Sequence, residues 1–194
     1  NMKNLISLIT LLILTNSYAN KSTYFMTFKD STKHKNLIQF VNPFIGTKNM
    51  GHTFPGATAP FGMVQLSPET NQQPMFIDGK YNPETYKYCA GYQYNDSTIF
   101  GFSHTHFSGT GHSDLGDFLI MPTTGKLNLE PGNATIPKSG YHSQFSHINE
   151  HAEPGYYKVK LDDYNIEVEL TASERVGFHQ YSFPKSDDAH IILD

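Results

Sequence analysis

The sequence predicts an all-β fold, an antiparallel β-sandwich with few or no long helices. Apolar and polar residues alternate with a period of two in Asn165–Ser173, which is typical of a half-buried strand. No segment beyond the N-terminal leader sustains a helical period, and 15 glycines and 11 prolines separate short apolar runs. Many short strands divided by turn residues favour a sandwich.

Four candidate strands follow one another near the C-terminus. In the clearest one, Ile166, Val168, Leu170 and Ala172 share one face. The turn-rich segments "DDYN" and "PKSDD" separate it from its neighbours, so we expect a meander of four consecutive antiparallel strands, at 155–161, 165–173, 175–183 and 189–194. Shorter candidates lie upstream, at 97–103, 116–122 and 125–131.

Glycine and proline dominate the block Val41–Thr70. Pro43, Pro55 and Pro60 have no N–H to donate to a strand ladder, so we predict a loop system ordered by its aromatic residues. Loops of this kind often place functional groups at the rim of a rigid scaffold.

The N-terminus has the features of a signal peptide. Lys3 precedes the apolar run Leu5–Leu14, which is shorter than the ~20 residues that span a bilayer, and the small residues Ser17 and Ala19 follow. We predict a signal peptide at 1–19, a polar linker at 20–36 and one domain at 37–194, exported to the periplasm or the extracellular space. A buried helix is the alternative for the apolar run. Cys89, as the single cysteine, can form no internal disulfide.

Composition disfavours two classes of partner. The formal net charge is -4 with 14 Lys and Arg residues and no basic run, so neither nucleic acid nor a membrane surface is indicated. The segment 189–194 ends inside an apolar strand pattern, and we therefore expect the chain to be the front part of a longer protein. A terminal strand that pairs within the domain is the alternative.

Histidines and aspartates gather in the glycine-rich stretch Gly101–Pro122, which holds His104, His106, His112, Asp114 and Asp117. Histidines two apart on a strand share a face, and a His/carboxylate set suits zinc or non-haem iron. However, the glycine-rich path fixes no geometry, so we assign no metal site here. A structural role and contact with a sugar are the two other hypotheses.

Several long segments carry a resemblance to a known family. "VNPFIGT", "GHTFPGATAPFGMVQLSPET", "CAGYQYNDSTIFGFSHTHFSGTG", "DLGDFLIMPTTG" and the stretch 145–184 resemble the N-terminal domain of glycoside hydrolase family 92, the calcium-dependent exo-α-mannosidases. The resemblance covers about 37–194. It implies a supersandwich of the galactose-mutarotase type, packed on a C-terminal (α/α)6 barrel with the active site between them.

The resemblance also implies a function. Such an enzyme removes terminal α-linked mannose, often α-1,2-linked, from N-glycans or mannans with inversion. Its general acid, general base and most calcium ligands lie in the barrel domain. We therefore expect no catalytic residue and no metal ligand in this chain, and no activity from the chain alone. Its expected partners are mannose-containing glycans and its own C-terminal domain.

Sugar contact requires aromatic faces for C–H patches and hydrogen-bonding groups for hydroxyls. The residues that offer these near the family motifs are the predicted substrate-binding set, namely His52, Phe54, Tyr88, Tyr92, His104, His106, Asp114 and Asp117. Tyr88 stands where family members often have tryptophan. For the aromatic residues, a place in the core is the alternative.

The remaining carboxylates do not suggest a catalytic pair. Inverting hydrolysis needs an acid and a base about 6.5–9.5 Å apart. Glu167 and Glu169 lie on the polar face of a predicted strand, and Asp162 and Asp163 lie in a predicted turn. Two other functions stay open: a stand-alone secreted carbohydrate-binding module, and a small histidine-dependent metalloenzyme.

Overall fold

The computed structural model of the protein describes residues 36–109 and 115–194. The predicted signal peptide, the predicted linker up to residue 35, and the candidate residues His112 and Asp114 lie outside the described residues. No helix in the described ranges has the length and apolar character needed to cross a membrane.

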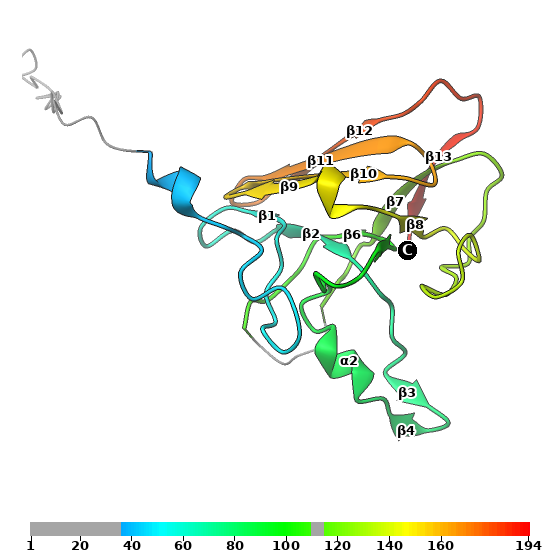
Figure 1. The fold of residues 1–194 in the computed structure, drawn as a ribbon, viewed down its shortest axis with the longest axis horizontal. Coiled ribbons are helices and arrows are strands. Elements are labelled where there is room, and N and C mark those ends of the chain that lie inside the picture. Colours follow the sequence, from blue (N-terminus) through cyan, green and yellow to red (C-terminus); the bar gives the residue numbers. More distant parts are fainter. Residues whose placement is uncertain (1–35, 110–114) are drawn as a thin grey trace, which may run out of the picture. The chain divides into compact units, whose positions relative to one another are not determined.

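Two antiparallel sheets lie one above the other (Figure 1). The first has the order β1-β2-β6-β7-β13, with the strands β1 (Ala57–Thr58), β2 (Gln65–Glu69), β6 (Gly101–Ser103), β7 (Ile120–Thr124) and β13 (Ala189–Leu193). The second has the order β12-β11-β10-β9, with β9 (Glu150–Glu153), β10 (Tyr156–Leu161), β11 (Ile166–Ala172) and β12 (Gly177–Ser182). The predicted all-β sandwich is confirmed.

Smaller elements connect the strands. Two short pairs are β3 (Phe76–Ile77) with β4 (Lys80–Tyr81) and β5 (Thr98–Ile99) with β8 (Ser143–Gln144). The helical segments of the described ranges are η1 (Leu37–Phe40), α2 (Glu84–Lys87) and η2 (His147–Asn149). None exceeds 4 residues, in agreement with the prediction of no long helix.

The core forms where the inward faces of the two sheets meet. Val159 of β10 pairs with Val168 of β11, and both are fully buried, as the alternation predicts. The other sheet contributes Leu66, Phe102 and Met121 to the same cluster. Burying one such side chain stabilises the fold by about 1.5–3 kcal/mol, so the alternation itself selects the inward face.

The predicted four-strand meander is wrong at its last strand. β13 leaves the β10–β12 meander and pairs with β7 in the other sheet, with Ile192 opposite Met121. The segment 183–188 carries the chain across, and Ile192 becomes buried. Because β13 crosses to the other sheet, its Ile192 side chain joins the core between the two sheets.

Two further expectations also differ from the structure. The block Val41–Thr70 was expected to be loop, yet it contains β1 and β2. β1 pairs only with Gln65 and Leu66, so the N–H that Pro68 lacks is not needed for that pairing. The segment 125–131 forms no strand, because its apolar residues Leu127 and Leu129 stay exposed and bury nothing.

A buried carboxylate holds β9 and β10 to the loop before β5. The Glu150 side chain is fully buried, and the hydroxyls of Tyr92 and Tyr157 donate to its Oε1 at 2.9 and 2.6 Å. Nδ1 of His147 lies 2.5 Å from its Oε2, and Nε2 of His147 donates to the Tyr94 carbonyl at 2.6 Å. Burial and the nearby carboxylate raise the pKa of both tyrosines, so each phenol remains a neutral donor.

Replacing Tyr157 by Phe should lower the free energy of unfolding by about 1.5–3 kcal/mol, the usual value of a hydrogen bond to a charged group. Tyr156→Phe is the matched control, because its hydroxyl bonds Glu169 in a partly buried, more accessible position of the same strand pair. The control should change stability by less than about 0.5 kcal/mol. Urea denaturation of both variants measures the difference, and equal losses would contradict a special role for Glu150.

Candidate functional site

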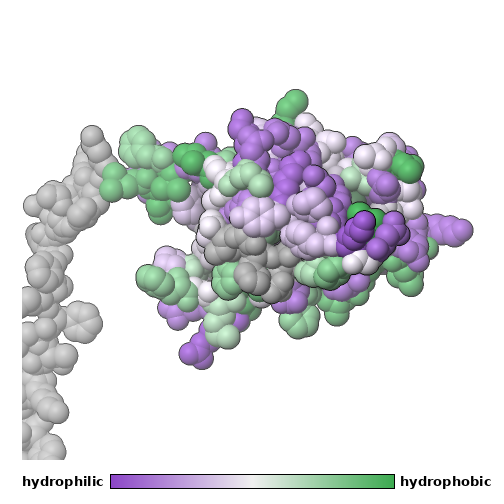
Figure 2. Space-filling model, turned by 90° about the horizontal axis from the view of Figure 1, so that it is seen from below, coloured by the Kyte–Doolittle hydropathy of each residue, from purple (hydrophilic) through white to green (hydrophobic). Residues whose placement is uncertain are grey.

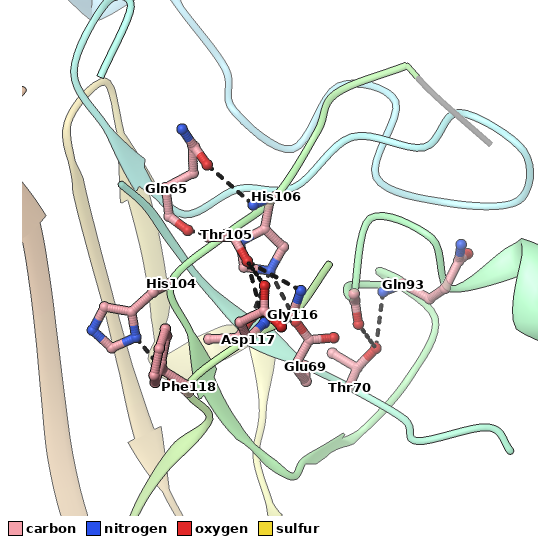
Figure 3. Close-up of polar contacts among 12 residues, drawn as sticks. Gln65, Glu69, Thr70, Gln93, His104, Thr105, His106, Gly116, Asp117 and Phe118 are labelled. Carbon is pink, nitrogen blue, oxygen red and sulfur yellow. Dashed lines mark hydrogen bonds and ion pairs between the residues drawn. The ribbon is translucent and has the colours of Figure 1, made fainter. Parts of the chain in front are cut away.

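His106 is buried and fully hydrogen-bonded between β2 and the chain that leaves β6. Its Nδ1 donates to the Gln65 carbonyl at 2.7 Å, and its backbone N–H donates to Gln65 Oε1 at 3.1 Å. Its Nε2 lies 2.9 Å from Glu69 Oε1 (Figure 3). The ring also packs on Phe54, with centroids 4.9 Å apart. Two predicted site residues, Phe54 and His106, therefore do meet.

Glu69 is the centre of this cluster. Its Oε1 accepts hydrogen bonds from the Ser103 hydroxyl and faces His106 Nε2. On its other side the backbone comes very close, because a Cβ on Gly91 would stand 2.3 Å from Glu69 Oε2. The side chain keeps 14% of its surface exposed, which is where it borders a pocket. Glu69 is thus hydrogen-bonded to buried side chains on one side and borders the pocket on the other.

Sequence reasoning missed Glu69 because it treated the surrounding block as loop. In a strand, residues 65, 67 and 69 share one face, so Gln65 and Glu69 both point to the side where His106 lies. Recognition of β2 as a strand would have provided this signal.

The pocket beside Glu69 has a volume of about 610 Å³. Its lining is mainly polar, with Tyr88 and leucines as its larger apolar surfaces. It comprises Glu69, Asn71, Gln72, Gln73, Pro74, Thr85, Tyr88, Leu115, Gly116, Leu119, Pro131, Gly132 and Asp194. This volume lies in the range of pockets that hold small ligands.

Two lining groups are held by hydrogen bonds. The Tyr88 hydroxyl lies 3.4 Å from both Asn71 Nδ2 and Asp96 Oδ1, and burial raises the pKa of Tyr88 to about 12. The Tyr141 hydroxyl donates to Asp194 Oδ2 at 2.5 Å. The pocket therefore presents a neutral phenol and two carboxylates in fixed positions.

The other predicted site residues lie apart from this pocket. His52 is buried, with Nδ1 2.6 Å from the Cys89 sulfur and its ring edge-on to Tyr86. Tyr92 belongs to the core and bonds Glu150. Asp117 is exposed and accepts from the Thr105 hydroxyl at 3.2 Å.

His104 lies in different surroundings from His106, because β6 ends at Ser103 and strand alternation stops there. Its Nδ1 donates to the Phe118 carbonyl at 2.9 Å (Figure 3). Its Nε2 lies 3.2 Å from Nε2 of His179 on β12. Burial, and secondarily His104, lowers the pKa of His179 to about 4. Nδ1 of His179 in turn faces the Tyr181 hydroxyl at 2.7 Å.

Comparison with known proteins agrees with this architecture. The profile of the Glycosyl hydrolase family 92 N-terminal domain matches residues 40–194. The chain belongs to glycoside hydrolase family 92. The family resemblance expected from the sequence motifs is thereby confirmed.

Solved structures of family members superpose on the chain. A family GH92 α-mannosidase of Bacteroides thetaiotaomicron in complex with mannoimidazole is 44% identical, with a TM-score of 0.75 over 82% of this chain and 20% of its own. A family GH92 inverting mannosidase of the same organism is 26% identical, with a TM-score of 0.60 over 84% of this chain and 20% of its own.

A curated relative, an uncharacterised secreted glycosidase of Arthroderma benhamiae, is 28% identical over 152 residues, which is 78% of this chain and 18% of the relative. The chain therefore spans about a fifth of the length of the proteins that it matches.

The described residues do not fit a calcium site. Calcium takes six to eight oxygen ligands, mainly carboxylates and carbonyls. Within 36–109 and 115–194 no group of three or more His, Cys, Asp and Glu side chains could hold a metal ion. The buried carboxylates of Glu69 and Glu150 instead face hydroxyl and imidazole groups.

Gly91→Ala should lower the free energy of unfolding by more than the backbone strain of an alanine at positive φ alone explains. Gly91 has φ +74°, and its added Cβ would collide with the Glu69 carboxylate. Gly79→Ala is the matched control, since Gly79 has φ +73° and no atom within 4 Å of its would-be Cβ. The control should lower the free energy of unfolding by about 1–2 kcal/mol. Gly91→Ala should lose about 1–3 kcal/mol more, measured by urea denaturation, and equal losses would show that Glu69 moves away freely.

The lowered pKa of His179 predicts a dependence of stability on pH. The unfolded chain protonates His179 more readily than the folded chain does. The contribution of neutral His179 to the free energy of unfolding is therefore complete above about pH 6.5. It should be lost progressively as the pH falls from there toward 4. His179→Gln should lose less stability over this interval than the wild type, by at most about 1.4 kcal/mol per pH unit. Thermal melts from pH 7.5 to 4 measure both proteins, and parallel profiles would contradict the assignment.

Proposed function

We propose that the chain is the N-terminal β-sandwich domain, residues 37–194, of a secreted α-mannosidase. The enzyme removes terminal α-linked mannose, often α-1,2-linked, from N-glycans or mannans with inversion. Membership of the family supports this, as do relatives that are α-mannosidases, one of them inverting. A secreted relative and the predicted signal peptide at 1–19 support export to the periplasm or the extracellular space.

The pocket beside Glu69 is the observation that carries the proposal. A pyranose offers hydroxyl donors around its rim and C–H patches on its faces. Glu69 is fixed by Ser103 and His106 and can accept from a hydroxyl, and the Tyr88 ring borders the same space. Because their positions are set by the fold, these groups bind without first being ordered.

Of the predicted substrate-binding residues, Tyr88 borders the pocket directly. His106 and Phe54 act through Glu69 and the backbone around it. We retain His52, Tyr92, His104 and Asp117, with Asp114 from outside the described ranges, as members of the wider predicted set. Their contribution would be to a substrate cleft completed by the rest of the enzyme.

The catalytic carboxylates and the calcium ligands are proposed to lie outside this chain. Glu150 is enclosed by its donors, and Glu167 pairs with Lys158 at 2.7 Å. Phe61, Met63 and Phe178 are exposed apolar side chains. On the face shown in Figure 2, apolar residues lie among hydrophilic ones. We propose, on the basis of the family membership, that the domain packs on another part of its own enzyme, the C-terminal (α/α)6 barrel.

A titration with α-1,2-mannobiose, followed by NMR of the labelled chain, tests the proposal. Shifts should concentrate on the residues that line the pocket, and Tyr88→Ala should weaken binding at least fivefold because the ring face is lost. The same chain should release no mannose from the disaccharide, with or without calcium.

Tyr81→Ala serves as the control, since Tyr81 is an exposed tyrosine of β4 that does not line the pocket. It should leave binding unchanged. Shifts elsewhere on the surface, or equal effects of the two substitutions, would contradict the pocket as the sugar site. Hydrolysis by the chain alone would contradict a domain without catalytic groups. The alternative, a stand-alone secreted carbohydrate-binding module, predicts that the chain by itself binds the sugar with full affinity.

A further inference from the structure

Two imidazoles from opposite sheets point their Nε2 atoms at each other. His104 follows β6 of the five-stranded sheet, and His179 lies on β12 of the four-stranded sheet. The Nε2 atoms are 3.2 Å apart, and the ring centroids are 4.9 Å apart with an interplanar angle of 28°. Both side chains are only partly buried, so solvent reaches the pair.

The hydrogen bonds around the pair determine which nitrogens carry protons. The Phe118 carbonyl can only accept, so Nδ1 of His104 carries a hydrogen and its Nε2 has a free lone pair. The Tyr181 hydroxyl can donate or accept, so His179 can carry its hydrogen on either nitrogen. With the hydrogen on Nδ1, donated to Tyr181, both Nε2 lone pairs face the same space.

This geometry matches a shared metal ion. Two imidazoles that bind one tetrahedral metal at about 2.0–2.1 Å place their nitrogens about 3.3 Å apart and their ring centres about 5 Å apart. We propose that His104 and His179 form a two-histidine site for a divalent transition metal such as Zn²⁺. Nδ1 of each ring would donate to an oxygen, of Phe118 for one and of Tyr181 for the other, as metal-bound histidines commonly do.

The donor set defines the class of metal. Imidazole nitrogen suits zinc, copper, nickel and iron, whereas calcium takes oxygen ligands. In the described ranges no group of three His, Cys, Asp and Glu side chains could hold a metal ion. In the proposed site the two imidazoles are therefore the protein ligands, and water would fill the remaining positions. The ion would be held by the Nε2 lone pairs of the two rings, and it would cross-link the two sheets.

Calorimetric titration of the metal-free chain with ZnCl₂ tests the site. The wild type should bind one zinc ion with an affinity that falls at least tenfold in His104→Gln and in His179→Gln. Its melting temperature should rise with zinc and return on addition of EDTA, because the ion binds only the folded chain. Tyr181→Phe keeps both ligands but removes the oxygen partner of Nδ1, and it should weaken binding about tenfold.

His151→Gln is the control, because His151 is an exposed histidine beside Glu153 and offers the ordinary surface alternative for zinc. It should leave the affinity unchanged. If wild-type zinc binding is absent, or is lost in His151→Gln but kept in the His104 and His179 variants, the pair is only a hydrogen bond. Should the two glutamine variants fail to fold, Tyr181→Phe decides, and an unchanged affinity there would overturn the proposal.

Discussion

A carboxylate that is largely withdrawn from water must be surrounded by donors, and the candidate site depends on this constraint at Glu69. Leaving a buried charge unpaired is strongly unfavourable, whereas bonds to Ser103 and His106 compensate for the lost hydration. His106 is oriented by Gln65, which lies at the start of β2, the strand that ends at Glu69. One strand thus fixes both the acid and the ring that faces it. The Glu69 carboxylate that borders the pocket is therefore held in a fixed position by the fold.

Glu150 shows the same constraint with the opposite outcome. Its donors, Tyr92, Tyr157 and His147, close around it completely, so it binds protein groups and no ligand. The difference lies in the backbone around each acid. Gly116 lacks a side chain and borders the pocket together with Glu69, whereas the missing side chain of Gly91 lets the backbone approach Glu69 on its other side. Glu69 therefore borders the pocket, whereas Glu150 is enclosed in the core.

Histidine roles in this protein follow from partners rather than from sequence neighbours. His104 and His106 are two residues apart, yet one faces His179 and the other faces Glu69. The pair His104–His179 joins the two sheets, and its two Nε2 atoms face each other. In the pair His106–Glu69 the imidazole faces a carboxylate of the neighbouring strand β2. This is why a metal is inferred for one pair and a positioning role for the other.

The sequence by itself determined the sandwich class, the strands β10, β11 and β12, and membership of family 92, because these depend on local alternation, turn residues and contiguous motifs. It also led to Tyr88, which borders the pocket. Only the tertiary structure decided the place of β13, the role of Glu69 and the contact between His104 and His179, which are 75 residues apart. Such contacts arise from sheet order and from the approach of distant segments, and the pattern of one segment does not contain them.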